Sequence, residues 1–264
     1  MTRPTDSAGY EVPAVGVICL DTSFTKIPGH IRNPATFGFP VVCHVVSGAT
    51  PERVVTRPDP ALLQPFVQAA VHLQAAGVSA VTSACGFLAL FQAELAGAVA
   101  IPVYSSSLMQ VPMVGRMLGP GRTVGILTAD ASSLSAAHLA GVGADRVPVR
   151  IAGMADQPEF REVILEGKRD DLDARRLRDE VVSLAEGLLR DHPDVGALVL
   201  ECTDLVPFAH DIQARTHLPV FDIVTLTELV HAGLSRRPFT AAVTVPPAAG
   251  RGRGTVISEY VEAP

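Results

Sequence analysis

Long apolar runs are missing from this 264-residue chain, although 48% of its residues are hydrophobic. No stretch reaches the roughly eighteen uninterrupted apolar residues that a membrane helix needs, so we expect no contact with a membrane. The first ten residues or so lack the hydrophobic segment of a secretory signal, and we expect a disordered lead-in to a cytoplasmic protein. The net charge is −6 and the arginines are scattered, so no basic stripe indicates a nucleic-acid partner.

Signatures of metal and cofactor binding are also scarce. The four cysteines form no Cys-x-x-Cys pair and the eight histidines show no metal-ligand spacing, so the sequence predicts no metal site. Only two lysines could hold pyridoxal phosphate as a Schiff base. Lys168 lies in a charged run, and Lys26 lies in a Pro/Gly loop with no phosphate cradle beside it. We therefore expect no cofactor, and free thiols rather than disulfides.

Short apolar runs of strand length alternate with longer segments of helical periodicity. The runs are rich in Val and Ile and bounded by Gly or Pro, as buried parallel strands are. Strand, helix and strand in this order predict βαβ units and an α/β fold with mainly parallel sheets. The expected strands are 14–20, 41–46, 78–83, 99–104, 123–128, 147–152, 196–201 and 219–223. The expected helices are 60–76, 87–96, 106–118, 132–141, 171–190, 205–216 and 226–234.

The chain also looks like a duplication. Residues 15–23 and 124–132 are similar strands that each end in Asp-x-Ser. Each half then carries a cysteine, Cys85 or Cys202, at the same distance before a Pro-Val step. Chance could supply either match alone, but both in register favour two related lobes.

We therefore expect two pseudo-symmetric lobes, each a short, mainly parallel sheet flanked by helices. The first would comprise residues 1–104 with 222–264, and the second residues 105–221. Ligands of open parallel sheets bind beyond the carboxyl ends of the strands. The active site should therefore lie in the cleft between the lobes.

The two matched cysteines are the main candidates for chemistry. A thiol where a strand meets a helix faces backbone N–H groups and the positive end of the helix dipole, which favours the thiolate. A buried free cysteine is common and carries no function by itself. We accept that interpretation for Cys19 and Cys43, which lie inside strands, and favour function for Cys85 and Cys202.

Carboxylates accompany both cysteines. Asp21 ends the first strand, Asp130 ends its counterpart, and Asp204 lies two residues after Cys202. Such a group can hold or transfer a thiol proton, although its charge also raises the thiol pKa. Asp21 could instead be a turn residue, and Asp204 an ordinary residue of a first helical turn. Glu201 is left as a secondary candidate, a salt-bridge partner.

The loop 24–40 is rich in Pro and Gly and follows the first expected strand. It carries Lys26, His30, Arg32 and Asn33. Such a loop could close on a ligand and offer Arg32 to a carboxylate. An ordered surface loop or a dimer contact is an equal alternative.

With these residues in view, the chain resembles the aspartate/glutamate racemase superfamily over most of residues 14–235. The Asp-Ser motif after the family's first strand looks like Asp21 and Thr22 here. The family's first cysteine motif, Ala-Cys-Asn-Thr, appears as residues 84–87. Its second motif, Cys-Thr followed by His or Glu, appears as residues 202–204. The resemblance implies two pseudo-symmetric α/β lobes and an enzyme that needs no pyridoxal phosphate.

By that resemblance the protein is a racemase or epimerase, an isomerase that inverts the α-carbon of a small carboxylate such as an amino acid or a derivative. Cys85 and Cys202 would be the two acid/base groups, served by Asp21 and Asp204. A homodimer is the family's habit. The implied substrate-binding residues are Thr22, Ser23, Ser83, Gly86, Phe87, Thr203, Arg32 and Asn33.

The sequence departs from the family pattern at the first cysteine. In amino-acid racemases an Asn and a Thr follow it and help bind the polar substrate, whereas here Gly86 and Phe87 follow. A less polar or larger acid is therefore expected. Arylmalonate decarboxylase keeps only the second cysteine, so two cysteines favour stereoinversion over decarboxylation. A cis–trans isomerase, decarboxylase or hydrolase that uses Cys202 stays open, as does a small-molecule-binding protein without catalysis.

Overall fold

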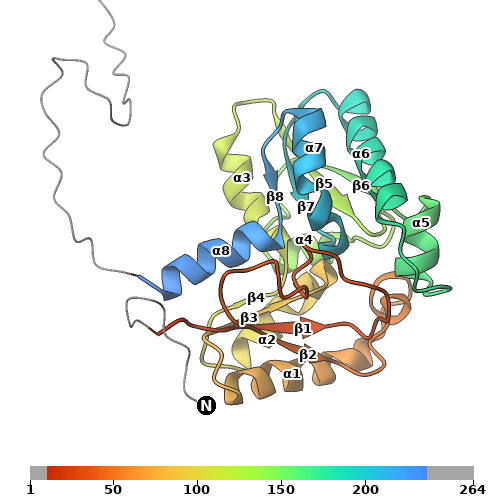
Figure 1. Cartoon of the computed structure of the whole chain (residues 1–264). Helices are drawn as coiled ribbons and strands as arrows, with labels where there is room; N and C mark the ends of the chain where they lie inside the picture. The colour runs from red at the N-terminus through yellow and green to blue at the C-terminus, as the bar shows by residue number, and fades with distance from the viewer. Residues whose placement is uncertain (1–10, 237–264) are drawn as a thin grey trace, which may run out of the picture.

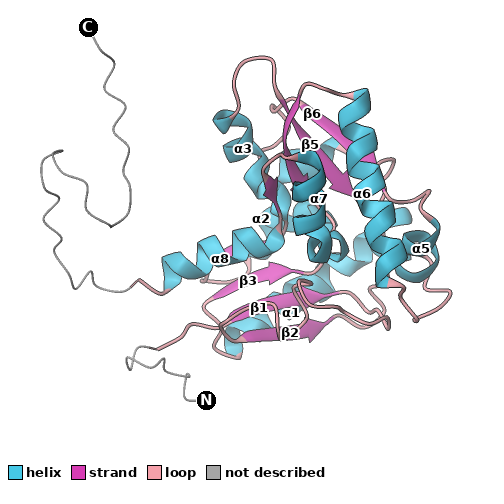
Figure 2. Ribbon diagram, turned by 45° about the horizontal axis from the view of Figure 1, so that its top comes forward, coloured by secondary structure: helices cyan, strands magenta, loops and turns pink. Residues whose placement is uncertain are grey.

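The computed structural model describes residues 11–236, which form two parallel four-stranded sheets flanked by helices (Figures 1 and 2). The strand orders are β2-β1-β3-β4 and β6-β5-β7-β8, so the two sheets repeat one topology. The expected α/β fold of two lobes is confirmed. The lead-in at residues 1–10 and the segment 237–264, which we assigned to the first lobe, lie outside the described residues.

The first sheet contains β1 (Val15–Cys19), β2 (Val41–Val45), β3 (Ala80–Ser83) and β4 (Val103–Tyr104). Helix α1 (Leu63–Ala75) covers one face, and α2 (Gln92–Gly97) lies near the far edge. The other face is covered by α8 (Ile223–Leu234), which runs back from the second sheet. Ile223 and Leu226 of this helix share a buried cluster with Val15 and Val17.

The second sheet contains β5 (Thr123–Thr128), β6 (Val149–Gly153), β7 (Val195–Leu200) and β8 (Val220–Phe221). Its helices are α3 (Val111–Met117), α4 (Ala136–Gly141), α5 (Pro158–Phe160), α6 (Ala174–Asp191) and α7 (Ala209–Thr216). Helix α6 buries the stripe Leu177, Val181, Ala185 and Leu188, close to the stripe that its periodicity predicts.

All eight expected strands are present, but several helices begin differently. Short segments of 3₁₀ helix precede α2, α3 and α7: η3 (Gly86–Phe91), η4 (Ser107–Gln110) and η6 (Thr203–Phe208). Helix α4 starts later than expected, because the Asp130 carboxylate accepts hydrogen bonds from the hydroxyl groups of Ser132 and Ser133 and holds a turn there. Side-chain hydrogen bonds of this kind compete with helix formation.

Two short elements escaped the sequence analysis. They are the π-helical turns η1 (Glu52–Thr56) in the first lobe and η5 (Arg161–Leu165) in the second, and they contact each other. Both carry buried aliphatic side chains across the junction of the lobes. Within residues 11–236, no helix combines the length and apolar character needed to cross a lipid bilayer.

The N-cap of α8 gives a stability prediction. The buried Asp222 carboxylate accepts a hydrogen bond from the Thr225 N–H at 2.8 Å. Asp222→Ala should lower the free energy of unfolding by about 1–2 kcal/mol, measured by urea denaturation. Glu228→Ala, on the exposed side of the same helix, is the control and should change it by less than about 0.5 kcal/mol. Equal losses in both variants would contradict a specific capping role.

Candidate active site

A pocket lies where the carboxyl ends of β1, β3 and β7 meet. It encloses about 480 Å³, including the space open to solvent at its mouth, and is lined from both lobes. Parallel strands bring the segments that follow them to one edge of a sheet, which is why residues distant in sequence converge here. The sequence-predicted residues that line it are Thr22, Arg32, Cys85, Gly86, Phe87, Cys202, Thr203 and Asp204.

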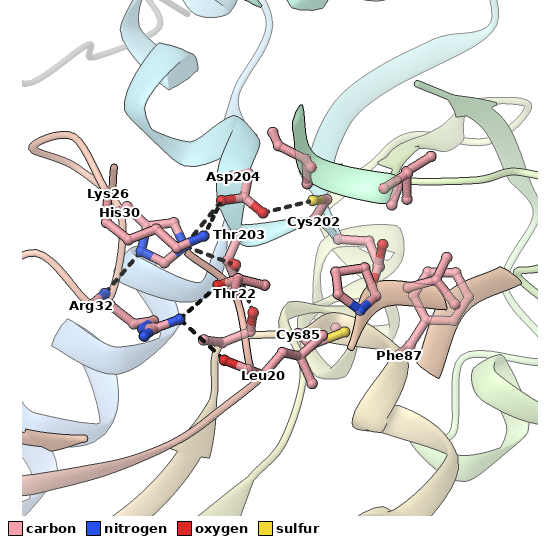
Figure 3. Close-up of a pocket in the computed structure, with 18 residues that line it drawn as sticks. Leu20, Thr22, Lys26, His30, Arg32, Cys85, Phe87, Cys202, Thr203 and Asp204 are labelled. Carbon is pink, nitrogen blue, oxygen red and sulfur yellow. Dashed lines mark hydrogen bonds and ion pairs between the residues drawn. The ribbon is translucent and has the colours of Figure 1, made fainter. Parts of the chain in front are cut away.

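Cys85 and Cys202 occupy equivalent positions in the two lobes. Each is the N-cap of a six-residue 3₁₀ turn, η3 or η6, and each side chain is buried but lines the pocket. In Figure 3 the two sulfur atoms lie on opposite sides of the pocket. The structure therefore brings the two predicted thiols together in one cavity.

Both thiols are protonated at neutral pH in this pocket. Burial, and then the charge of Glu201, raises the pKa of Cys85. Burial, followed by Asp204 and Glu201, raises the pKa of Cys202 well above its usual value. Backbone N–H groups of η3 and η6 act in the opposite direction but are outweighed. The expectation that the start of a helix would favour the thiolate is therefore wrong for both cysteines, because desolvation is the larger effect.

Asp204 is the centre of a charge cluster beside Cys202. Its Oδ1 lies 3.3 Å from both Lys26 Nζ and His30 Nε2, and its Oδ2 accepts the Cys202 S–H at 3.9 Å (Figure 3). Burial alone would raise the pKa of Asp204, but Lys26 and His30 outweigh it and hold that pKa well below the usual range. Asp204 is thus an anion stabilised by its basic neighbours, and it can orient the Cys202 thiol.

Arg32 supplies a second positive charge from the same loop. Its Nη1 donates to the Leu20 carbonyl at 3.2 Å and to Thr22 Oγ1 at 2.9 Å, which fixes the guanidinium beside the pocket. Thr203 Oγ1 donates to the Ala84 carbonyl at 2.9 Å and so links the two lobes. With Lys26, this wall of the pocket presents the charge needed to bind a carboxylate.

Glu201 is a buried acid at the end of β7. Thr128 Oγ1 donates to its Oε2 at 2.6 Å, whereas its Oε1 has no hydrogen-bond partner among the described residues. Burial raises the pKa of Glu201 to about 7, because desolvation of the carboxylate outweighs the hydrogen bond from Thr128. No other carboxylate that lines the pocket has a raised pKa.

Aliphatic and aromatic side chains complete the pocket. Val55 comes from η1, Ile164 and Leu165 come from η5, and Phe87 follows Cys85. The two π-helical turns that the sequence analysis missed therefore build the apolar wall. This wall fits the expectation that the ligand is less polar than an amino acid.

Other sequence-predicted residues lie outside the pocket lining. Asp21 is exposed and its Oδ2 accepts the Gly48 N–H at 2.9 Å, so the structure shows no contact between it and Cys85. Asn33 donates to the Lys26 carbonyl, and Ser83 donates to the carbonyls of Cys85 and Ser105, which makes both supports of the site. Ser23 is exposed. Asp130, expected in the cleft, instead binds the hydroxyl groups that follow it.

Lys26, His30 and Glu201 are the pocket residues that sequence reasoning undervalued. Lys26 and His30 were visible as basic residues in the loop after the first strand, but their partner Asp204 lies more than 170 residues away. Glu201 was visible as an acid next to the second cysteine, at the end of an apolar strand. Across residues 11–236, no group of three or more His, Cys, Asp or Glu side chains is placed to hold a metal ion.

Comparison with known proteins assigns the fold to a family. Residues 40–227 match the model of the Asp/Glu/Hydantoin racemase family, and the chain belongs to this family. It is 32% identical over 232 residues to a dimethylsulfoniopropionate lyase of Durusdinium sp. clade D, which covers 85% of this chain and 76% of that protein. It is also 32% identical to dimethylsulfoniopropionate lyase 6 of Emiliania huxleyi (strain CCMP1516), covering 86% of this chain and 61% of the longer relative.

Solved structures of the same fold include several enzymes. Unliganded arylmalonate decarboxylase gives a TM-score of 0.53 at 19% identity, covering 84% of this chain and 92% of that one. Aspartate racemase of Picrophilus torridus gives a TM-score of 0.55 at 14% identity, covering 84% and 94%. At these identities the likeness shows the fold alone. The proteins that resemble this chain thus include lyases by sequence and a racemase by fold, which carry out different classes of reaction.

The buried acid predicts an unusual pH dependence of stability. Because the folded state raises the pKa of Glu201 from 4.5 to about 7, this group contributes stability below pH 4.5 that is lost as the pH rises through 7. Glu201→Gln removes that loss. The difference in free energy of unfolding between Glu201→Gln and the wild type should therefore shift in favour of the variant by about 2 kcal/mol between about pH 5 and about pH 8.

Urea denaturation at both pH values measures this difference. Glu94→Gln, on an exposed carboxylate of α2, is the control and should show almost no change with pH. If Glu201→Gln were equally destabilising at both pH values, Glu201 would be an ordinary ionised partner in the folded state.

Proposed function

We propose that this protein is a lyase that cleaves dimethylsulfoniopropionate or a closely similar sulfonium acid. A thiolate takes a proton from the carbon next to the carboxylate, and the released electron pair forms the new C=C bond. The C–S bond breaks at the same time or directly afterwards, and its electron pair leaves on sulfur. The products are dimethyl sulfide and acrylate, with the proton on the enzyme thiol.

The observation that carries this proposal is the pair of buried, protonated thiols in one pocket. The similarity of the chain to dimethylsulfoniopropionate lyases supports it further. The similarity to the Durusdinium lyase covers 85% of this chain, enough to include residues of both lobes. Proton removal next to a carboxylate needs a base that is close and desolvated, and Cys85 and Cys202 both meet that description.

A substrate that carries a sulfonium group beside its carboxylate also suits the electrostatics of the pocket. The charges of Glu201 and Asp204 help raise the thiol pKa values, so an acid with a second negative charge would disfavour the thiolate further. A sulfonium group has the opposite effect, since a nearby positive charge lowers a thiol pKa. Binding of such a substrate would itself help generate the base.

Cys202 is the base in this mechanism. Its S–H points to Asp204 Oδ2, and the contacts of that carboxylate, an ion pair with Lys26 and a hydrogen bond with His30, fix the orientation of the sulfur. Arg32 and Lys26 hold the substrate carboxylate and stabilise the charge that develops on it during proton removal. The apolar wall formed by Val55, Ile164 and Leu165 accommodates the methyl groups.

Racemisation of a small acid is the second candidate, favoured by the presence of Cys85 opposite Cys202. It shares the first step, proton removal from the α-carbon. It differs in the second step, because a racemase returns a proton to the other face whereas a lyase expels a leaving group. Which step follows depends on the substrate that the pocket selects.

Product analysis tests the two candidates. Wild-type protein should release dimethyl sulfide and equimolar acrylate from dimethylsulfoniopropionate, measured by gas chromatography and NMR. Cys202→Ser should lower this rate by at least about 100-fold, because the serine hydroxyl is a far weaker base at the same place. Cys43→Ser is the matched control, since Cys43 is exposed on β2 outside the pocket, and it should retain full activity.

A parallel incubation in D₂O with chiral amino and 2-substituted acids tests racemisation. Incorporation of α-deuterium without any release of dimethyl sulfide would reject the lyase proposal in favour of a racemase. Release of dimethyl sulfide that survives Cys202→Ser would reject Cys202 as the base.

Arg32 should control substrate affinity. Arg32→Gln removes the charge from the carboxylate-binding wall while keeping hydrogen-bond donors, and it should raise KM by about tenfold or more. Arg116→Gln on the exposed face of α3 is the control and should leave KM unchanged. An unchanged KM in Arg32→Gln would show that Lys26 alone binds the carboxylate.

A further inference from the structure

Glu201 is a buried acid of the pocket in which one carboxylate oxygen has no partner among the described residues. It is 1% exposed, yet its Oε1 accepts no hydrogen bond within the described part of the chain. A buried carboxylate oxygen without a partner is costly, and such a group in a native site indicates a role for a ligand. The carboxylate lines the same pocket as Cys85 and Cys202.

The opposite lobe is shaped to admit this carboxylate. A side chain built on Gly86 would collide with Glu201 Oε1 and with the Glu201 carbonyl oxygen. Only glycine at position 86 leaves the space that the acid occupies. The backbone of Gly86 is not in the left-handed region, so its small size rather than its flexibility is what the site uses.

The charges of the pocket are therefore divided. Lys26 and Arg32 lie on one wall, and Lys26 is paired with Asp204. Glu201 has no ion pair within residues 11–236, and the charged group that influences it most is another acid, Asp204. The aromatic ring of Phe87, two residues beyond Cys85, lines the same pocket. Aromatic rings attract cations that carry only methyl groups, and above about pH 7 the Glu201 carboxylate adds a negative charge to the same pocket.

We propose that Glu201, with Phe87, is the binding site for the methylated onium group of the substrate, and that it selects onium carboxylates over neutral acids of the same shape. This inference rests on the lyase proposal and adds the residue that determines its substrate class. A sulfonium or quaternary ammonium group has no N–H to donate, so its attraction to Glu201 is through charge and needs no hydrogen bond to the covered Oε1 atom. The substrate would lie with its carboxylate at Arg32 and its cation at Glu201.

Two pairs of isosteric ligands test this assignment. Dimethylsulfoniopropionate is matched in shape by 4-methylpentanoate, and 3-(trimethylammonio)propanoate by 4,4-dimethylpentanoate. Affinities for all four ligands are measured by competition with thiol alkylation of the pocket, and those for the three non-sulfonium ligands also by calorimetry. The wild type should prefer each onium acid to its neutral isostere by about tenfold or more.

Glu201→Gln keeps the size of the side chain and should reduce this preference to about one, by weakening onium binding rather than binding of the neutral acid. Glu201→Asp keeps the charge and should retain a preference, which a purely structural role would not predict. Glu94→Gln should behave as the wild type. A preference that persists unchanged in Glu201→Gln would overturn the assignment, as would an equal loss of affinity for both ligands of a pair.

The failure of this inference can be separated from failure of the lyase proposal. If the wild type releases dimethyl sulfide but Glu201→Gln keeps the onium preference, only the role of Glu201 is rejected. If the wild type releases none but prefers onium acids in a Glu201-dependent way, the onium site stands and the elimination reaction is rejected.

Discussion

The meeting of two parallel sheets at their carboxyl ends is the constraint on which the site depends. It places the segments after β3 and β7 against each other, so that each lobe contributes one thiol to a shared and mostly desolvated pocket. Desolvation then disfavours every charge in that pocket unless a partner compensates it. The chemistry of Cys85 and Cys202 is therefore governed by the charges that surround them rather than by the short 3₁₀ turns that they cap.

Of the two acids in the pocket, one has basic partners that stabilise its negative charge and the other has none within residues 11–236. Asp204 is held as an anion by Lys26 and His30, both from the loop after β1. Glu201 has no cation and retains its proton up to about neutral pH. Both thiols are protonated in this site, and under the proposed lyase reaction the sulfonium group of the substrate would lower their pKa on binding, so that substrate recognition and activation of the base become a single event. That coupling would also limit thiolate reactivity in the absence of substrate.

The fold followed from the sequence more completely than the site did. Eight Val- and Ile-rich runs between Gly and Pro gave all eight strands, and the matched cysteines gave the shared pocket, because these signals are local or repeated. The partners of Asp204 were not predictable, since the ion pair from Lys26 to Asp204 depends on how a loop of the first lobe folds over the second. The π-helical turns η1 and η5 were missed because their short apolar segments match neither strand nor helix periodicity. The orientation of Glu201 at the end of β7 required the structure.

The contact between Gly86 and Glu201 distinguishes this pocket from the racemase motif that the chain resembles. In that motif an asparagine that helps bind a polar substrate follows the first cysteine. In this structure any side chain at position 86 would collide with the Glu201 carboxylate and with the Glu201 carbonyl oxygen, so an asparagine has no room there. With glycine at position 86, an acid from the other lobe takes the place of a neutral amide near the first thiol. Under the onium site that we propose at Glu201, the same fold and the same two thiols serve a substrate with a methylated cation, which leaves as a neutral sulfide once the α-proton has been removed.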